Sequence, residues 1–137
     1  MKLPTLDELL NSTLLHDGCI EAVSLSMTGK GAYEAVIDLS IYPEPGSPHR
    51  EAISIVTEGL QQISVDCSIP LLSQHRPAGN LSFGLEPPDA PSPSAFELHL
   101  AGGFVRIAAR TIHIEGERQP PPENGSRPSG RLFASWA

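Results

Sequence analysis

The sequence predicts an α+β protein that is mostly β, with an N-terminal helix followed by an antiparallel meander of six or seven strands in a sandwich-like or strongly curled sheet. Segments in which apolar and polar residues alternate with a period of two recur along the chain, and this alternation is typical of strands that bury one face. Connections rich in proline and glycine separate these segments.

The helix is predicted from a capping box at residues 5–8. In this motif the Thr5 hydroxyl accepts a hydrogen bond from the Glu8 amide, while the Glu8 side chain reaches back to the Thr5 amide. We expect the helix to end near Asn11 or Ser12 and to depend on packing against the sheet, because a helix this short is unstable alone. Its apolar face carries Leu6, Leu9 and Leu10.

Seven segments carry the period of two, and the clearest of them spans residues 33–41. Gly59 is expected to end the third strand, and residues 70–80 are expected to be irregular with a single helical turn. The expected strands are residues 19–27, 33–41, 52–57, 63–69, 81–85, 96–100 and 105–114.

The same alternation predicts which side chains share the core. In the last strand the apolar phase changes between Ala109 and Ile112, which predicts a β-bulge near Arg110, since one extra residue reverses every later side chain. In the strand at 81–85 we expect Phe83 to face inward. The residues expected to share one core are Ile37, Leu39, Ile63, Val65, Phe96 and Leu98.

The chain of 137 residues has room for one domain, which we place at residues 1–115. Residues 116–137 read as a flexible tail rich in proline and glycine. Three apolar residues near its end could either dock on the domain or remain free: Leu132, Phe133 and Trp136.

Charge and cysteine content restrict the environment and the partners. The net charge is −7, which disfavours a role in binding nucleic acid, because phosphate neutralisation needs clustered Lys and Arg. The sequence shows neither the apolar core of a signal peptide nor an apolar run of 18 residues, so we expect a cytoplasmic protein that does not enter a membrane. Cys19 shares the apolar phase of Val23, and Cys67 also falls on an apolar phase, so both are expected to be buried free thiols.

His16 and Asp17 are the first candidates for a special role, because they are adjacent polar residues at the junction between helix and first strand. They have two interpretations: a structural one, in which Asp17 caps the turn and His16 bonds a nearby carbonyl, and a functional one. The candidate binding residues are His16, Asp17, Glu97, His99, Arg106, Arg110 and His113.

The motifs of common catalytic sites are missing from the sequence. It contains no Gly-x-Ser-x-Gly elbow, no glycine-rich phosphate loop and no closely spaced His or Cys pair that is typical of zinc sites. We therefore expect no catalytic residues, no metal ligands and no cofactor. A metal site remains an alternative if four residues from different segments converge: His16, Asp17, His99 and His113.

The residues Leu15-His16-Asp17-Gly18, followed by Ile20 and Val23, resemble the "HD-x-x-[IL]" opening of small β-rich bacterial domains among the immunity proteins of polymorphic toxin systems. In those domains the motif precedes a β-meander with a segment similar to residues 53–63. The resemblance covers roughly residues 14–69, and residues 70–80 lack the tryptophan found in some of those domains. It implies a bacterial protein that binds and blocks a toxin without chemistry of its own.

The function expected from the sequence is a small cytoplasmic protein-binding module, with an immunity protein as its most specific form. The acidic charge suits a basic toxin domain through electrostatic steering. Two other classes stay open: a small-ligand or metal-binding domain, and a non-catalytic oligomeric structural domain. The oligomeric state stays open as well.

Overall fold

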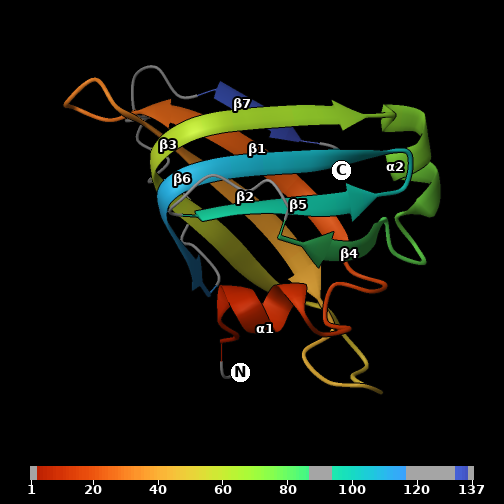
Figure 1. Cartoon of the computed structure of the whole chain (residues 1–137). Coiled ribbons are helices and arrows are strands. Elements are labelled where there is room, and N and C mark those ends of the chain that lie inside the picture. The colour runs from red at the N-terminus through yellow and green to blue at the C-terminus, as the bar shows by residue number, and fades with distance from the viewer. Residues whose placement is uncertain (1–2, 87–93, 117–131, 136–137) are drawn as a thin grey trace, which may run out of the picture.

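A seven-stranded antiparallel sheet forms the body of the protein in the computed structural model, which describes residues 3–86, 94–116 and 132–135 (Figure 1). The predicted fold class, mostly β with a short N-terminal helix, is confirmed. The elements are α1 (Leu6–Leu10), β1 (Cys19–Met27), β2 (Tyr33–Ile41), β3 (Glu51–Cys67), α2 (Ile69–His75), β4 (Leu81–Leu85), β5 (Ser94–Leu100), β6 (Gly103–Glu115) and β7 (Leu132–Ser135).

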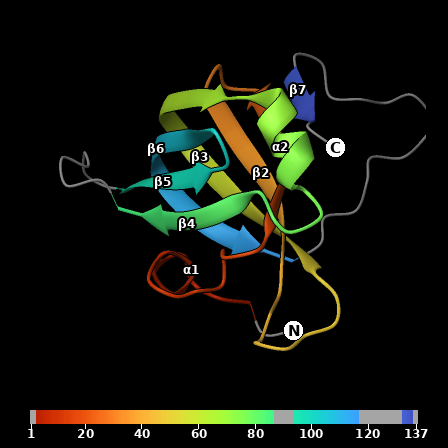
Figure 2. The ribbon, with the colours of Figure 1, turned by 90° about the vertical axis from the view of Figure 1, so that its right-hand side faces the viewer.

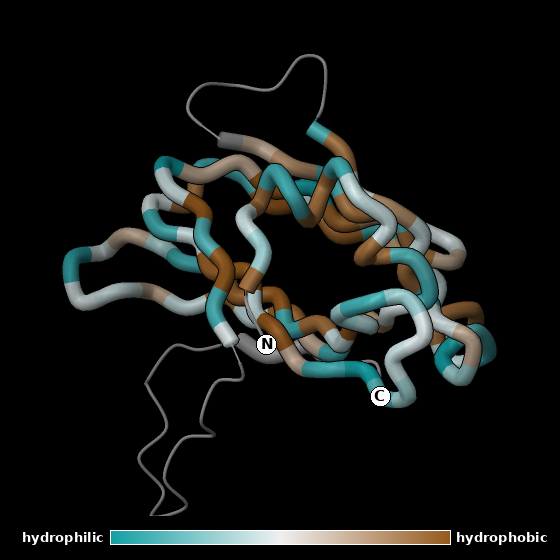
Figure 3. Tube along the Cα trace, turned by 90° about the horizontal axis from the view of Figure 1, so that it is seen from below, coloured by the Kyte–Doolittle hydropathy of each residue, from teal (hydrophilic) through white to brown (hydrophobic). Residues whose placement is uncertain are grey.

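The strand order is β4-β5-β6-β3-β2-β1-β7. Strands β1, β2 and β3 form one meander and β4, β5 and β6 form a second, so the two are joined where β6 pairs with β3. The sheet curls strongly, with α1 below it and α2 at one side (Figures 1 and 2). Seen from below, the strands run round a common interior and carry most of the apolar residues (Figure 3).

The N-terminal helix forms as the capping box predicts. The Thr5 hydroxyl accepts from the Glu8 amide and the Glu8 carboxylate accepts from the Thr5 amide, both at 3.2 Å. Leu9 and Leu10 are buried and belong to the core, which gives the short helix the tertiary packing that it needs. No helix in the described ranges has the length and apolar character needed to cross a membrane.

The prediction that Gly59 ends a strand is wrong, because β3 continues through it for 17 residues. Gly59 has a φ of +63°, a conformation that glycine adopts without a steric penalty, and an added Cβ would lie 2.8 Å from the Arg110 Cβ. The register to β6 then shifts between Leu60 and Gln62. The β-bulge expected near Arg110 of β6 is therefore present close to that residue, but the extra residue belongs to β3 and not to β6.

The core contains four of the six residues expected there with side chains fully buried, namely Ile37, Leu39, Phe96 and Leu98. Ile63 is only partly buried and packs against the core, and the expectation for Val65 is wrong, since it is 41% exposed. The cause is that β3 leaves β2 after the pair Val36–Val56. Beyond that point the second half of β3 pairs with β6 and no longer with β2, so the edge that β2 occupied is open beside Val65.

Where β2 and β3 separate, the buried Thr57 hydroxyl takes over the hydrogen bonding of the sheet. It accepts from the Ala35 amide at 2.9 Å and donates to the Ala35 carbonyl at 3.1 Å. Both backbone groups of Ala35 are thereby satisfied in the interior, which removes the cost of leaving buried polar groups unpaired. Thr57 therefore marks the point where β2 and β3 separate, because its hydroxyl replaces the backbone pairing that ends there.

Asn80 connects the two meanders on the side opposite the β3–β6 pairing. Its side chain is buried, with Oδ1 accepting from the Ile20 amide at 2.9 Å and Nδ2 donating to the Leu72 carbonyl at 3.1 Å. The next residue, Leu81, donates its amide to the Gly18 carbonyl at 2.9 Å. The start of β4 is therefore held against the start of β1. The expected single turn at residues 70–80 is a longer helix, α2, whose Leu72 is fully buried.

The tail prediction needs a correction at its end. Residues 132–135 form β7, which pairs with Ala22–Leu25 of β1, so these four residues belong to the sheet. The tryptophan at position 136 and residues 117–131 lie outside the described residues. Sequence composition identifies the proline-rich stretch, but it does not reveal an edge strand that depends on a distant partner.

Replacing Asn80 by Ala should destabilise the protein by about 2–4 kcal/mol, because it leaves the Ile20 amide and the Leu72 carbonyl buried without partners. Asn80→Asp keeps the acceptor for Ile20 and loses the donor to Leu72, so it separates the two bonds. Urea denaturation measures both variants. A loss below about 0.5 kcal/mol for Asn80→Ala, the range of ordinary surface changes, would contradict the role given to this side chain.

Leu39→Ala should cost about 2–5 kcal/mol, since Leu39 is fully buried in the central strand of the first meander. Val65→Ala is the matched control and should cost less than about 1 kcal/mol, because its side chain is partly exposed. Equal losses for the two variants in thermal or urea unfolding would show that the inner faces of the two strands are buried alike.

Candidate functional site

The seven candidate binding residues fall into three separate places. His16 and Asp17 lie in the loop before β1, Glu97, His99 and Arg106 lie on β5 and the first half of β6, and Arg110 and His113 lie on the second half of β6. The first of these places borders a cavity. The structure therefore does not unite them into a single site.

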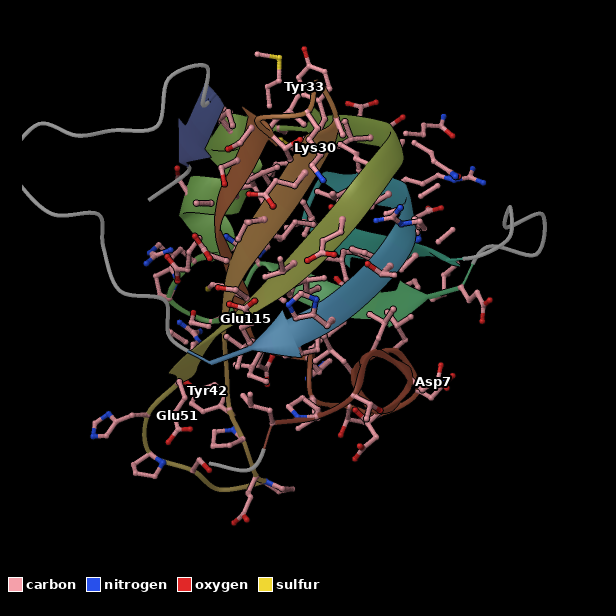
Figure 4. All side chains as sticks on the ribbon, turned by 90° about the vertical axis from the view of Figure 1, so that its left-hand side faces the viewer. Asp7, Lys30, Tyr33, Tyr42, Glu51 and Glu115 are labelled. Carbon is pink, nitrogen blue, oxygen red and sulfur yellow. The ribbon has the colours of Figure 1, made fainter. Side chains whose placement is uncertain are left out.

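The cavity is an open groove of about 610 Å³ between the loop at residues 13–17 and the loop at residues 42–47. Its polar lining includes His16, Asp17, Tyr42 and Glu44. Figure 4 shows Tyr42 near the lower end of the molecule, at the base of the loop between β2 and β3. We call this cavity the loop groove.

The loop at 13–17 is shaped by backbone hydrogen bonds. The His16 amide donates to the Thr13 carbonyl at 3.1 Å, and the Gly18 amide donates to the Leu15 carbonyl at 3.0 Å. Asp17 takes a φ of +65°, a left-handed conformation that Asp and Asn tolerate better than most residues. Gly79 packs directly behind it, where an added Cβ would lie 2.5 Å from the Asp17 Cα.

The His16 and Asp17 side chains point to solvent and pair with each other, with Nδ1 and Oδ2 3.2 Å apart. They are 71% and 59% exposed, so the pair contributes little to stability. The structural interpretation expected the Asp17 side chain to cap the turn and His16 to bond a carbonyl; in the structure the Asp17 backbone makes the turn, and the two side chains pair with each other. The Asp17 carboxylate faces the loop groove and is available to a partner, as the functional interpretation requires.

Arg50 holds the walls of the loop groove together, and sequence reasoning missed it. Its Nε donates to the Asp17 carbonyl at 3.1 Å and its Nη2 donates to the Pro77 carbonyl at 3.3 Å. The guanidinium also lies 5.3 Å from the centre of the Tyr42 ring, a cation–π distance. Three segments that are far apart in sequence meet at this side chain, so no local pattern could have identified it.

The second place is the outer face of β4, β5 and β6. Glu97 Oε1 and His99 Nε2 are 2.9 Å apart, and the Phe83 ring stacks on the His99 ring at 4.4 Å with an angle of 10°. Arg106 is the cross-strand neighbour of Glu97. The expectation that Phe83 faces inward is wrong, because a register shift between Leu81 and Phe83 turns it outward, where it is 49% exposed.

The third place carries Arg110 and His113, both on the second half of β6. Arg110 is exposed and packs over Gly59, while His113 Nε2 lies 2.7 Å from Glu115 Oε2. Three histidines therefore each pair with a carboxylate close in sequence. Among the described residues no group of three or more His, Cys, Asp or Glu side chains could hold a metal ion. The alternative metal site does not assemble from His16, Asp17, His99 and His113.

A further polar cluster joins the end of α2 to β1. Arg76 Nη2 lies 2.8 Å from Glu21 Oε2, and the Ser40 hydroxyl donates to Glu21 Oε1 at 2.8 Å. The hydrogen bond to Glu21 raises the pKa of Arg76, with burial acting in the opposite direction. The buried Cys19 thiol donates to the Arg76 carbonyl at 3.3 Å. Cys19 and Cys67 are both free, as expected, although Cys67 is only partly buried.

Comparison with known proteins does not assign this arrangement to a family. The chain matches no family model, no curated protein and no solved structure. Inference about function therefore depends on the loop groove and on the other surfaces described above.

Asp17→Ala should destabilise the protein by about 1 kcal/mol, because alanine pays a penalty in the left-handed conformation. Asparagine and glycine tolerate that conformation, so the free energies of unfolding of Asp17→Asn and Asp17→Gly should lie within about 0.5 kcal/mol of the wild-type value or above it. Thermal unfolding of the three variants tests whether backbone conformation or the carboxylate matters. A loss of about 1 kcal/mol in Asp17→Asn as well would assign the stabilising role to the carboxylate.

Proposed function

We propose that the protein is a non-catalytic binding module that takes a basic segment of a protein partner into the loop groove. The observation that carries the proposal is the chemistry of the groove lining. Asp17 and Glu44 contribute two carboxylates to the lining, against the guanidinium of Arg50, whose Nε and Nη2 are already engaged with the Asp17 and Pro77 carbonyls. A groove of this kind attracts a cationic side chain and repels an anionic one.

The groove also offers aromatic and hydroxyl groups, which can contact a partner in addition to the two carboxylates. Tyr42 offers a ring and a phenolic oxygen, and Thr13 and Ser47 supply further hydroxyls. Tyrosine is common among the residues that dominate protein interfaces, since it combines a rigid apolar ring with a polar tip. The net charge of −7 extends the attraction beyond the groove and favours fast association with a basic partner.

The specific form of the proposal is an immunity protein that binds a basic toxin in the cytoplasm. The two polar residues that carry the resemblance to immunity domains, His16 and Asp17, both line the loop groove. The exposure of their side chains also suits contact with a partner. The inhibition would be steric, because a bound partner needs no reacting group from this chain.

The proposal is tested by placing a photo-crosslinking residue at the exposed Thr13 in the groove and, as a control, at the exposed Glu58 of β3, which is not part of the groove lining. In the source cells we expect the Thr13 position, and not the Glu58 position, to capture a basic protein. Capture of the same proteins at both positions, or of acidic proteins alone, would contradict the proposal.

The captured partner then allows a quantitative test of the carboxylates. The double variant Asp17→Asn, Glu44→Gln should weaken binding about tenfold, which corresponds to about 1.4 kcal/mol, with a smaller salt dependence. Glu58→Gln, an exposed change on β3, is the matched control and should leave binding unaltered. Equal affinity of the two variants for the partner would show that the groove is not part of the interface.

The immunity function has its own readout. Expression of the partner alone should arrest growth, and coexpression with the wild-type chain should restore it. Charge reversal by Asp17→Lys and Glu44→Lys should abolish the rescue while Glu58→Lys retains it. A partner that binds through the groove without arresting growth would refute the immunity function and leave the binding module in place.

A further inference from the structure

We propose that the outer edge of β1 is a second binding site, which accepts an extended peptide segment of a partner in place of β7. The proposal is independent of the loop groove. It follows from how the edge of β1 is covered and from the way β7 is connected to the rest of the chain.

The edge of β1 is covered in sections by different parts of the chain. At its start, the Ile20 amide donates to Asn80 Oδ1, and the preceding Gly18 carbonyl accepts from the Leu81 amide. The middle section, Ala22–Leu25, pairs with the four residues of β7. The last two residues of the strand extend past the final β7 pair, and Met27 is 51% exposed. The site we infer is therefore Ala22–Met27, which is longer than the section that β7 covers.

The register across the sheet shows how far β7 lies from the preceding strand. Glu115 of β6 is opposite Ser54, Ser54 is opposite Asp38, Asp38 is opposite Ala22, and Ala22 is opposite Ser135. Four steps between neighbouring strands amount to about 19 Å. The first residue of β7, Leu132, is paired with Leu25 and lies about 10 Å further along the strand direction.

The connection between β6 and β7 is longer than this path requires. Sixteen residues, 116–131, can span up to about 55 Å, whereas the direct path from Glu115 to Leu132 is about 21 Å. The connection therefore does not force β7 onto β1. Because the connection is covalent, it keeps β7 at a finite effective concentration near the edge of β1. A partner strand that pairs with more than four residues of β1 can compete with it.

The excess length of the connection between β6 and β7 favours a partner peptide over exchange of β7 between two copies of the chain. Short, strained connections promote strand exchange between protomers, because they hinder closure within one chain. A connection with excess length closes within its own chain at a small entropic cost. The occupant we infer is an extended peptide that adds antiparallel to β1 by backbone hydrogen bonds, as in strand addition to exposed sheet edges.

The sequence of β7 indicates the chemistry of this peptide. Leu-Phe-Ala-Ser consists of two large apolar residues followed by two small ones and carries no charge. Its partners on β1 run from Leu25 to Ala22, so the large residues pair with the half of the site nearer Met27. A competing segment should repeat this order of large and small residues and continue toward Met27 with a further apolar residue.

The test uses two full-length variants, Phe133→Pro and Ala134→Pro. In an antiparallel ladder, successive residues alternate between pairs that exchange hydrogen bonds and pairs that do not. Ala35 bonds Thr57 on its β3 side, so its β1 partner Leu25, and with it Val23, presents its backbone groups to β7. Val23 is paired with Ala134, so Ala134→Pro removes an amide that donates to β1, whereas Phe133→Pro replaces an amide that points away and is the matched control. The probe is a labelled peptide with the sequence of residues 131–136 in which Arg131→Leu supplies the further apolar residue on the side of Met27.

The variant that loses the donor should exchange the amides of Val23 and Leu25, which face β7, at least tenfold faster than the control variant. It should also bind the peptide at least tenfold more tightly than the wild type, with the β1 protection restored, because the competing strand is weakened. A peptide in which the four β7 residues are scrambled should bind less tightly. Amide protection at Ile37 and Leu39 should be retained in both variants, since these residues belong to the core.

Four results would overturn the proposal: equal peptide affinity for the wild type and both variants, unchanged exchange at Val23 and Leu25, loss of protection throughout the core in both variants, or a wild-type dimer by light scattering that dissociates in the donor-loss variant. The last result would show that β7 is exchanged between copies. Because the Thr13 crosslinking experiment probes the other end of the molecule, its outcome does not affect this one.

Discussion

The buried amide of Asn80 is the interaction on which the shape of the molecule depends. The two meanders share backbone pairing only between β3 and β6 among the described strands, so a second connection is needed on the far side of the curl. Asn80 provides it with one acceptor toward β1 and one donor toward α2. A side-chain amide can satisfy both a backbone donor and a backbone acceptor at once, which an apolar residue at this position could not do. The Ala101 amide completes the junction by donating to the Asn80 carbonyl at 2.9 Å.

The position of the loop at residues 13–17, one wall of the loop groove, depends on this junction. Gly79, next to Asn80, packs behind Asp17 too closely for any side chain, and Arg50 ties the Asp17 carbonyl to the Pro77 carbonyl. The loop before β1 is thus backed by the segment that the Asn80 amide fixes. Exposed binding residues need such support, because a side chain on an unsupported loop loses conformational entropy when it binds.

Local signals in the sequence were sufficient for the elements that local interactions determine. The capping box at Thr5 and the alternation of β2 and β5 depend on neighbours in the chain, and both were predicted correctly. The failures occur where one residue changes the phase. A register shift between Ile20 and Ala22 places Ile20 in the core cluster with Val23, whereas Cys19, fully buried as expected, has its thiol against the Arg76 carbonyl.

Other features could not be predicted because they depend on distant partners. Val65 has the alternation of a buried residue, but its exposure is decided by where β3 leaves β2. The candidate site was predicted in part: His16 and Asp17 line the loop groove, whereas Tyr42 and Glu44 belonged to a proline-rich segment that indicated only the end of a strand. A groove between two loops has no sequence period, since its members meet only after the sheet has curled.

The distribution of histidines bears on the kind of function that the surface can support. An acid–base site needs titratable groups that converge on one reacting atom and are shielded from water. Here His16, His99 and His113 each pair with a carboxylate one or two residues away in sequence, at three separate places. The most exposed of these pairs, that of His16, is also the one beside the loop groove. Solvated polar groups around an open acidic groove suit recognition of a cationic surface, where charge and shape must match but no bond must be broken.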